Sequence, residues 1–260
     1  MPDTQLFEAM IAAAIEAGRA AWAVYNSDFE VLTKQDQSPV TAADHAAEAV
    51  ILAHLGKAAP GIPVVAEEQV AAGHVPAQAA EFFLVDPVDG TKEFVQKRGD
   101  FTVNIALVRK GIPELGVVYA PAKSQLFAGD ASARAAFRST QSPDGPDQAP
   151  RTPIHTREPP ANGLTVVASR SHRTPETDAW LAEVRVADVV SVGSSLKFCL
   201  LAAGEADLYP RLGPTMEWDT AAGQAVLVAA GGAVMNLDGT PFRYGKPGFR
   251  NPHFIAVARS

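Results

Sequence analysis

Residues 82–91, FFLVDPVDGT, place two carboxylates on a stiff bend at the end of a buried strand. The apolar run that opens the segment is stopped by turn residues, which predicts a short strand that delivers Asp86 at its end. A proline cannot donate to a sheet ladder, and Asp89-Gly90 is a turn pair, so the chain must bend here. Carboxylates on a rigid turn suit Mg²⁺, and the N–H groups of Gly90 and Thr91 suit a phosphate. An ordinary Asx turn with Asp89 as a helix cap would account for the same pattern.

Length and composition limit the class of protein. A chain of 260 residues can bury a large core, as one big domain or as two of ordinary size. The net charge of −7 argues against nucleic acid or an anionic membrane as a partner. A single cysteine, Cys199, leaves no intrachain disulfide and no cysteine-based zinc site. The N-terminus has no basic leader, and no apolar run approaches ~18 residues. We therefore expect a cytoplasmic protein without a transmembrane segment, with peripheral membrane association left open.

The pattern of apolar residues divides the chain into two parts. Residues 1–160 begin with helices near 4–25 and 41–55, and short connections between the later strands predict an antiparallel meander. We expect these strands at 63–66, 82–86, 101–108, 115–119, 126–129 and 133–137. Residues 139–163 carry six prolines and are expected to form a loop.

Residues 161–260 alternate between strand and helix. We expect strands at 164–168, 189–192, 206–209, 233–237 and 254–258, and helices at 175–184, 195–203 and 220–230. Helices, an antiparallel sheet and then an α/β half predict layered sheets with helices between them.

Carboxylates recur where an expected element meets a turn, at Asp44, Glu67, Asp86, Asp89 and Asp219. Each has an ordinary structural explanation. Asp44 suits the first turn of a helix, Glu67 and Glu68 could form a solvated corner, and Asp219 stands at a natural N-cap.

Taken together and in this order, three motifs resemble the magnesium-dependent, lithium-sensitive phosphatases of the inositol monophosphatase superfamily, over essentially the whole chain. The motifs are VAEE at 65–68, DPVDGT at 86–91 and WDTAAG at 218–223. Three further segments resemble the CysQ-type 3′(2′),5′-bisphosphate nucleotidases within that superfamily: KEF at 92–94, GSSLKFC at 193–199 and LYPR at 208–211. The resemblance implies a sugar-phosphatase fold, an α-β-α-β-α sandwich with an antiparallel N-terminal sheet and a mixed C-terminal sheet. It also implies that the active site lies between the two parts.

The resemblance also implies roles for individual residues. Two to three Mg²⁺ ions would be bound by Glu67, Asp86, the Val88 carbonyl, Asp89 and Asp219. Asp44 and Thr91 would orient the attacking water, and Glu67 would share in catalysis. The residues implied in substrate binding are Glu67, Asp89, Gly90, Thr91, Gly193, Ser194, Lys197, Arg211 and Asp219. Such an inventory suits phosphate monoester hydrolysis, which requires charge neutralisation, a nucleophile and its alignment.

The substrate depends on the basic residues in this acidic chain. Arg211 has the fork for bidentate contact with a second phosphate, and Lys197 lies in a segment that resembles a substrate-facing one. Both could instead be surface residues. We expect removal of the 3′-phosphate from adenosine 3′,5′-bisphosphate to give AMP, which would clear a by-product of sulfate assimilation. Hydrolysis of inositol 1-phosphate or another sugar phosphate is the alternative.

Other features leave choices open. Residues 169–173, SRSHR, could contact the nucleoside or form an ordinary polar turn. A protein that binds phosphate or nucleotide without catalysis is the remote alternative, which the complete set of carboxylates disfavours. We expect a small phosphorylated nucleoside as the partner, no nucleic acid, and a monomer or homodimer.

Overall fold

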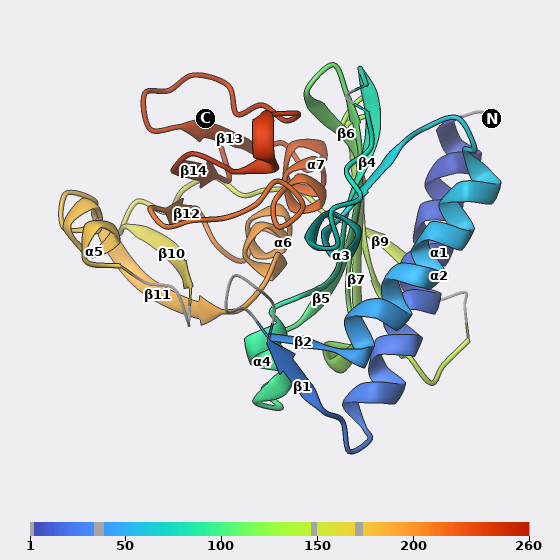
Figure 1. Ribbon diagram of the computed structural model, residues 1–260. Helices are drawn as coiled ribbons and strands as arrows, with labels where there is room; N and C mark the ends of the chain where they lie inside the picture. The colour runs from blue at the N-terminus through green and yellow to red at the C-terminus, as the bar shows by residue number, and fades with distance from the viewer. Residues whose placement is uncertain (1–2, 34–38, 78, 147–149, 170–173, 260) are drawn as a thin grey trace.

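The computed structural model describes residues 3–33, 39–77, 79–146, 150–169 and 174–259, whose helices and sheets alternate in five layers (Figure 1). The helices are α1 (Asp3–Tyr25), α2 (Ala42–Ala58), α3 (Glu67–Ala71), α4 (Thr91–Val95), α5 (Pro175–Leu181), α6 (Leu196–Ala202) and α7 (Ala221–Ala229), with short 3₁₀ turns η1 (Pro121–Lys123) and η2 (Pro247–Phe249). The strands of the first part are β1 (Val31–Thr33), β2 (Pro39–Thr41), β3 (Val64–Ala66), β4 (Glu81–Asp89), β5 (Thr102–Arg109), β6 (Ile112–Ala120), β7 (Gln125–Asp130), β8 (Ala135–Thr140) and β9 (Arg151–Pro153). Those of the second part are β10 (Leu164–Ser169), β11 (Val186–Val192), β12 (Leu208–Arg211), β13 (Ala233–Asn236) and β14 (Phe254–Val257).

The larger sheet has seven strands in the order β3-β4-β5-β6-β7-β8-β9. From β4 onwards each strand pairs antiparallel with the next, which confirms the predicted meander. The expectation of a wholly antiparallel sheet is corrected by β3, which pairs parallel with β4. A parallel neighbour needs a crossover connection, and residues 67–80 with α3 supply one of sufficient length.

The smaller sheet has five strands in the order β11-β10-β12-β14-β13. Strands β11, β10 and β12 are parallel, while β14 is antiparallel to both β12 and β13, so the predicted mixed sheet is confirmed. The gap between β9 and β10 contains the predicted boundary at residue 160. The division into two halves stays a prediction.

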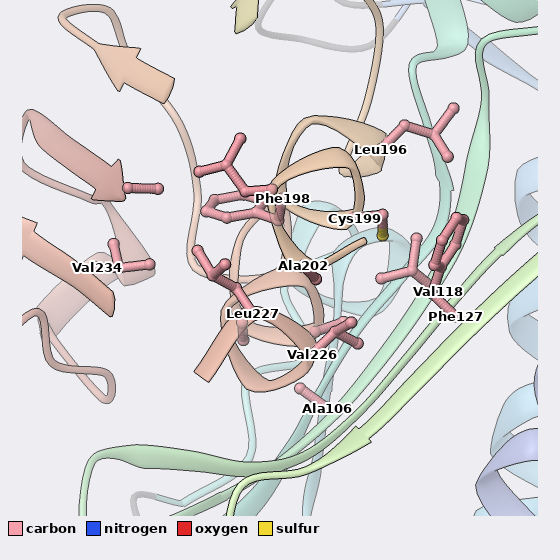
Figure 2. Packing of buried hydrophobic residues seen from close by; sticks show 14 of the residues in the cluster. Ala106, Val118, Phe127, Leu196, Phe198, Cys199, Ala202, Val226, Leu227 and Val234 are labelled. Atoms are coloured by element: carbon pink, nitrogen blue, oxygen red, sulfur yellow. The ribbon is translucent and has the colours of Figure 1, made fainter. Parts of the chain in front are cut away.

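Helices cover the faces of both sheets in the predicted α-β-α-β-α order (Figure 1). Helices α1 and α2 bury residues such as Met10 and Ile51 against one face of the larger sheet. Helices α6 and α7 lie between the sheets, where Cys199 of α6 faces Val118 and Phe127 of the larger sheet (Figure 2). Phe198 faces the other way and packs on Tyr209 and Phe254 of the smaller sheet. On the outer face of the smaller sheet, Leu181 of α5 packs on Val166 and Leu208. The core between the sheets therefore draws on both parts of the chain, and removing apolar area from water there holds them together.

The strand that carries the first motif differs from the expected one. It continues past Asp86 to Asp89, although its pairing with β5 is interrupted there. Asp86 lies opposite Asn104 and Asp89 opposite Thr102, so three steps along β4 match two along β5. This extra residue is a β-bulge, and it accommodates Pro87 within the strand.

Candidate active site

A cavity of about 200 Å³ lies where β4, α4, α6, β12 and α7 meet, and both parts of the chain line it. Nine residues of the expected site are in its wall: Glu67, Asp89, Gly90, Thr91, Gly193, Ser194, Lys197, Arg211 and Asp219. Asp44, Asp86 and Val88 are buried, with exposed fractions of 1%, 2% and 1%. The fold thus brings together residues that are up to 152 positions apart, from Glu67 to Asp219.

The turn after β4 contributes Gly90 and Thr91 to the wall of this cavity. The N–H of Val88 donates to Asp86 Oδ1 at 3.1 Å, and Thr91 Oγ1 donates to the Val88 carbonyl oxygen at 3.1 Å. Gly90 has a φ of 88°, and a Cβ there would lie 2.8 Å from the main-chain oxygen of Asp100. Only glycine fits this position, which keeps the backbone bare where an anion would approach it.

Asp44 lies in the first turn of α2 and fixes the start of that helix. Its Oδ2 accepts hydrogen bonds from the Thr41 N–H at 2.8 Å and from Thr41 Oγ1 at 2.9 Å, and Thr41 Oγ1 accepts from the Ala43 N–H at 3.1 Å. This is the capping box expected for a Thr cap with an acid three residues later. Strand β2, which ends at Thr41, packs on α4, so the start of α2 is held beside the turn with Thr91. Direct action of Asp44 through Thr91 stays a prediction.

Three half-buried carboxylates, Glu67, Asp89 and Asp219, line part of the cavity. Burial and the nearby charges of Asp89 and Glu67 raise the pKa of Asp219 well above its ordinary value. Burial also raises the pKa of Asp89, while the ammonium of Lys197 acts in the opposite direction. Asp89 is further held by Asn104 Nδ2, at 3.4 Å from its Oδ2. Burial and the like charges of their neighbours disfavour the ionised form of these carboxylates, and a bound cation would favour it.

The part of the cavity wall that carries these carboxylates fits a hard divalent cation. Its donors are carboxylate oxygens and the nearby Val88 carbonyl, the set that Mg²⁺ prefers, with cysteine and histidine absent from the cavity wall within the described residues. Across the described ranges, no three such acidic, imidazole or thiol side chains already converge as a ligand set. The carboxylates therefore have to come closer together to bind an ion, and the charge of that ion would offset the burial and the repulsion that raise the pKa of Asp219.

Two basic side chains, Lys197 and Arg211, also line the cavity. Lys197 and Arg211 are 6% and 7% exposed, and Lys197 Nζ donates to the Ser194 carbonyl oxygen. Burial lowers the pKa of Lys197 to about 8, against the favourable charge of Asp89. Arg211 donates to the Pro214 carbonyl oxygen at 2.9 Å. Arg211 Nε and Ser194 Oγ are buried and find no hydrogen-bond partner within the described ranges of the chain. Buried donors of this kind are suited to an anionic ligand.

The structure adds residues that the sequence did not single out. Tyr209 and Phe198 line the cavity, and Asn104 reaches Asp89 from β5. The signal for Tyr209 was available, because it precedes Arg211 by two residues in a strand and so shares its face. Asn104 could be found only from the register that sets it opposite Asp86. Residues 170–173, which were considered for nucleoside contact, lie outside the described residues.

Known proteins match the chain along nearly all of its length. The family model described as "Inositol monophosphatase family" matches residues 3–256. The "3′(2′),5′-bisphosphate nucleotidase CysQ" of Salmonella typhimurium (strain LT2) is 44% identical over 252 residues, which are 96% of this chain and 98% of that protein. The protein of the same description from Escherichia coli (strain K12) is 44% identical over 241 residues, 92% of this chain and 94% of its own.

Solved structures match the fold as well. The crystal structure of CysQ from Bacteroides thetaiotaomicron, described as a bacterial member of the inositol monophosphatase family, superposes with a TM-score of 0.82 at 37% identity and covers 98% of each chain. The inositol monophosphatase from Anabaena (Nostoc) sp. PCC 7120 superposes with a TM-score of 0.77 at 25% identity, covering 100% of this chain and 93% of its own. Within the described ranges, no helix is long and apolar enough to cross a membrane.

Proposed function

Because the chain belongs to the inositol monophosphatase family, we propose that it is a 3′(2′),5′-bisphosphate nucleotidase, which removes the 3′-phosphate of adenosine 3′,5′-bisphosphate to give AMP and phosphate. The observation that carries the choice of substrate is that one cavity is lined by two chemically different sets of residues. One set is the carboxylates with the turn at Gly90, and the other is the buried cations Lys197 and Arg211. We call these two sets the acidic end and the basic end of the site. A substrate with two phosphates matches both sets, and a monophosphate leaves the second set unused.

The acidic end would hold two to three Mg²⁺ ions through Glu67, Asp86, the Val88 carbonyl, Asp89 and Asp219. Bound Mg²⁺ supplies positive charge to the phosphoryl group and lowers the pKa of water. The backbone N–H groups of Gly90 and Thr91 would hold the phosphoryl oxygens, which the missing side chain of Gly90 allows to approach.

Thr91 would orient the attacking water. Its hydroxyl proton is directed to the Val88 carbonyl, so its oxygen lone pairs can accept a hydrogen bond from water. Asp44 is fixed by Thr41 beside this turn and would support that orientation. Water supplies the oxygen that bonds to phosphorus as the bond to the ribose 3′ oxygen breaks, and a proton passes to that oxygen. The balance is one water consumed for one AMP and one phosphate.

The basic end would hold the 5′-phosphate. Arg211 Nε and Ser194 Oγ are donors with no partner in the described ranges, and Lys197 adds a positive charge beside them. Charge-assisted hydrogen bonds to phosphate are shorter and stronger than neutral ones, and a desolvated site strengthens them further.

Phosphate release from four substrates tests the proposal. They are adenosine 3′,5′-bisphosphate, 3′-phosphoadenosine 5′-phosphosulfate, inositol 1-phosphate and fructose 1,6-bisphosphate, each with Mg²⁺ and with excess chelator. We expect the highest kcat/KM for a nucleoside substrate and loss of activity in chelator. A higher kcat/KM for inositol 1-phosphate would replace this proposal with the sugar-phosphate alternative, which the fold match to inositol monophosphatases also supports.

A further inference from the structure

We propose that Asp100, with Lys123 as its counter-ion, is a positioning residue that sets the spacing between the turn at Gly90 and the segment that begins at Gly193, and thereby the preference for a bisphosphate. The inference rests on the proposed function. Asp100 lies in the loop between α4 and β5, outside the cavity wall, and its side chain is 3% exposed.

The contacts of Asp100 join the two parts of the chain. Its Oδ2 accepts a hydrogen bond from the Gly193 N–H at 3.2 Å, across 93 positions of sequence. Its Oδ1 lies 2.9 Å from Lys123 Nζ. A buried carboxylate with an ammonium on one oxygen and an N–H donor on the other is paired on both sides, which removes most of the cost of burying it.

The main chain of Asp100 packs closely against both Gly90 and Gly193. A Cβ on Gly90 would lie 2.8 Å from the Asp100 carbonyl oxygen, and a Cβ on Gly193 would lie 2.9 Å from that same oxygen. Asp100 is therefore packed between the turn proposed to bind the reacting phosphoryl group and the segment that begins at Gly193. Glycine at both positions permits this close approach, so the spacing of the two segments follows the placement of Asp100.

The segment after Gly193 needs such an anchor. Ser194 has a φ of 52°, in the left-handed region, which is strained for a non-glycine residue and persists only when neighbours fix it. The carbonyl oxygen of Ser194 accepts from Lys197 Nζ, and its buried Oγ has no partner in the described ranges. The placement of Gly193 therefore determines where Ser194 Oγ and Lys197 Nζ lie. Asp100 thus acts on the second anion through the Gly193 N–H.

Two substitutions and their combination test this arrangement. Asp100→Asn leaves one oxygen for two donors, and the charged Lys123 competes for it, which turns the amide NH₂ towards the Gly193 N–H. Lys123→Met leaves the Asp100 bond to Gly193 in place. In the combination Asp100→Asn with Lys123→Met, the amide oxygen is free to accept from Gly193. Arg138→Met, which removes an exposed ion pair with Glu205, is the matched surface control.

Kinetics are compared for adenosine 3′,5′-bisphosphate and adenosine 3′-monophosphate. We expect Asp100→Asn to raise KM for the bisphosphate about tenfold, with kcat and the monophosphate constants changed less than about threefold, because a uniform binding interaction is lost. Lys123→Met alone should change the ratio of kcat/KM for the bisphosphate to kcat/KM for the monophosphate less than about threefold. Adding it to Asp100→Asn should restore most of the preference for the bisphosphate that Asp100→Asn alone removes. A merely structural defect would affect both substrates and would worsen in the combination.

Amide exchange of Gly193 gives a readout without substrate. We expect a protected Gly193 N–H in the wild-type protein, exchange at least about tenfold faster in Asp100→Asn, and recovery in the combination. An unprotected Gly193 in the wild-type protein overturns the proposal without any variant. Equal losses on both substrates, or faster exchange with an unchanged substrate ratio, also overturn it. If the wild-type protein prefers a sugar monophosphate, the proposed function fails, and the exchange of Gly193 still decides whether Asp100 anchors the segment.

Discussion

Replacing Arg211 tests the basic residues of the cavity separately from its carboxylates, because Arg211 is proposed to bind the second phosphate and not a metal ion. Arg211→Met keeps most of the side-chain volume and removes the guanidinium, whose Nε is buried without a partner in the described ranges and whose Nη2 is tied to the Pro214 carbonyl. The second phosphate then loses one charge-assisted contact while Lys197 remains. Such a contact is worth about 1.5–3 kcal/mol, so kcat/KM for adenosine 3′,5′-bisphosphate should fall roughly ten- to a hundredfold.

The assay is steady-state phosphate release with that bisphosphate and with adenosine 3′-monophosphate, which lacks only the second phosphate. For the monophosphate, kcat/KM should fall less than about threefold. The preference for the bisphosphate over the monophosphate should therefore narrow by nearly the whole loss of roughly ten- to a hundredfold, to within about that margin. Arg211→Lys should lose part of the preference, since it keeps the charge and lacks the fork. Arg157→Lys is the control. Arg157 does not line the cavity, and its Nε lies 2.8 Å from Asp207 Oδ1. This change should lower the stability of the fold and leave the substrate preference intact. Equal losses on both substrates in Arg211→Met would refute the reasoning.

Three further predictions address the acidic end and a buried acid near it. Asp89→Asn should lower kcat about a hundred- to a thousandfold with the near-ultraviolet circular dichroism unchanged, and near-wild-type turnover at saturating Mg²⁺ would mean that Asp89 is only a turn residue. Excess chelator should abolish activity and added Mg²⁺ should restore it, whereas activity that persists in chelator would contradict the ligand assignment. Burial raises the pKa of Glu48 from 4.5 to about 7. The neutral carboxyl group therefore contributes to the stability of the fold, and this contribution is fully present below pH 4.5 and is lost as the pH rises through about 7. Glu48→Gln should therefore remove a decline of up to about 3 kcal/mol in the free energy of unfolding between pH 5 and pH 8, measured by urea denaturation, and an unchanged slope would show that other groups cause it.

The parts of the fold that the sequence predicted are those with a buried face. Strands β4, β5 and β6 are nearly continuous apolar runs because both of their faces pack in a core, and α1 carries apolar residues at helical spacing because one of its faces does. Strands β1 and β9 were missed, and all three residues of each are exposed. No burial pattern could have revealed them, and β9 lies within the proline-rich residues 139–163 that were expected to be a loop.

The site was predictable to the extent that its residues stand in local motifs. Asp89 and Gly90 could be named because they follow an expected strand, and Asp219 because it precedes an expected helix. Asp100 and Asn104 act through tertiary contacts, with Gly193 and with Asp89, and such contacts depend on sheet register and on how the two parts of the chain meet. A sequence read alone contains neither.

Identification of the product made from adenosine 3′,5′-bisphosphate tests the central claim most directly. The protein is incubated with the bisphosphate and Mg²⁺, and the nucleotides are separated and compared with the 5′- and 3′-monophosphates. We predict adenosine 5′-monophosphate and one equivalent of phosphate, because in the proposed site the carboxylates and their Mg²⁺ would act on the 3′-phosphate while Lys197 and Arg211 would hold the 5′-phosphate. Adenosine 3′-monophosphate as the product, or a bisphosphate that stays intact while inositol 1-phosphate is hydrolysed, would contradict the account.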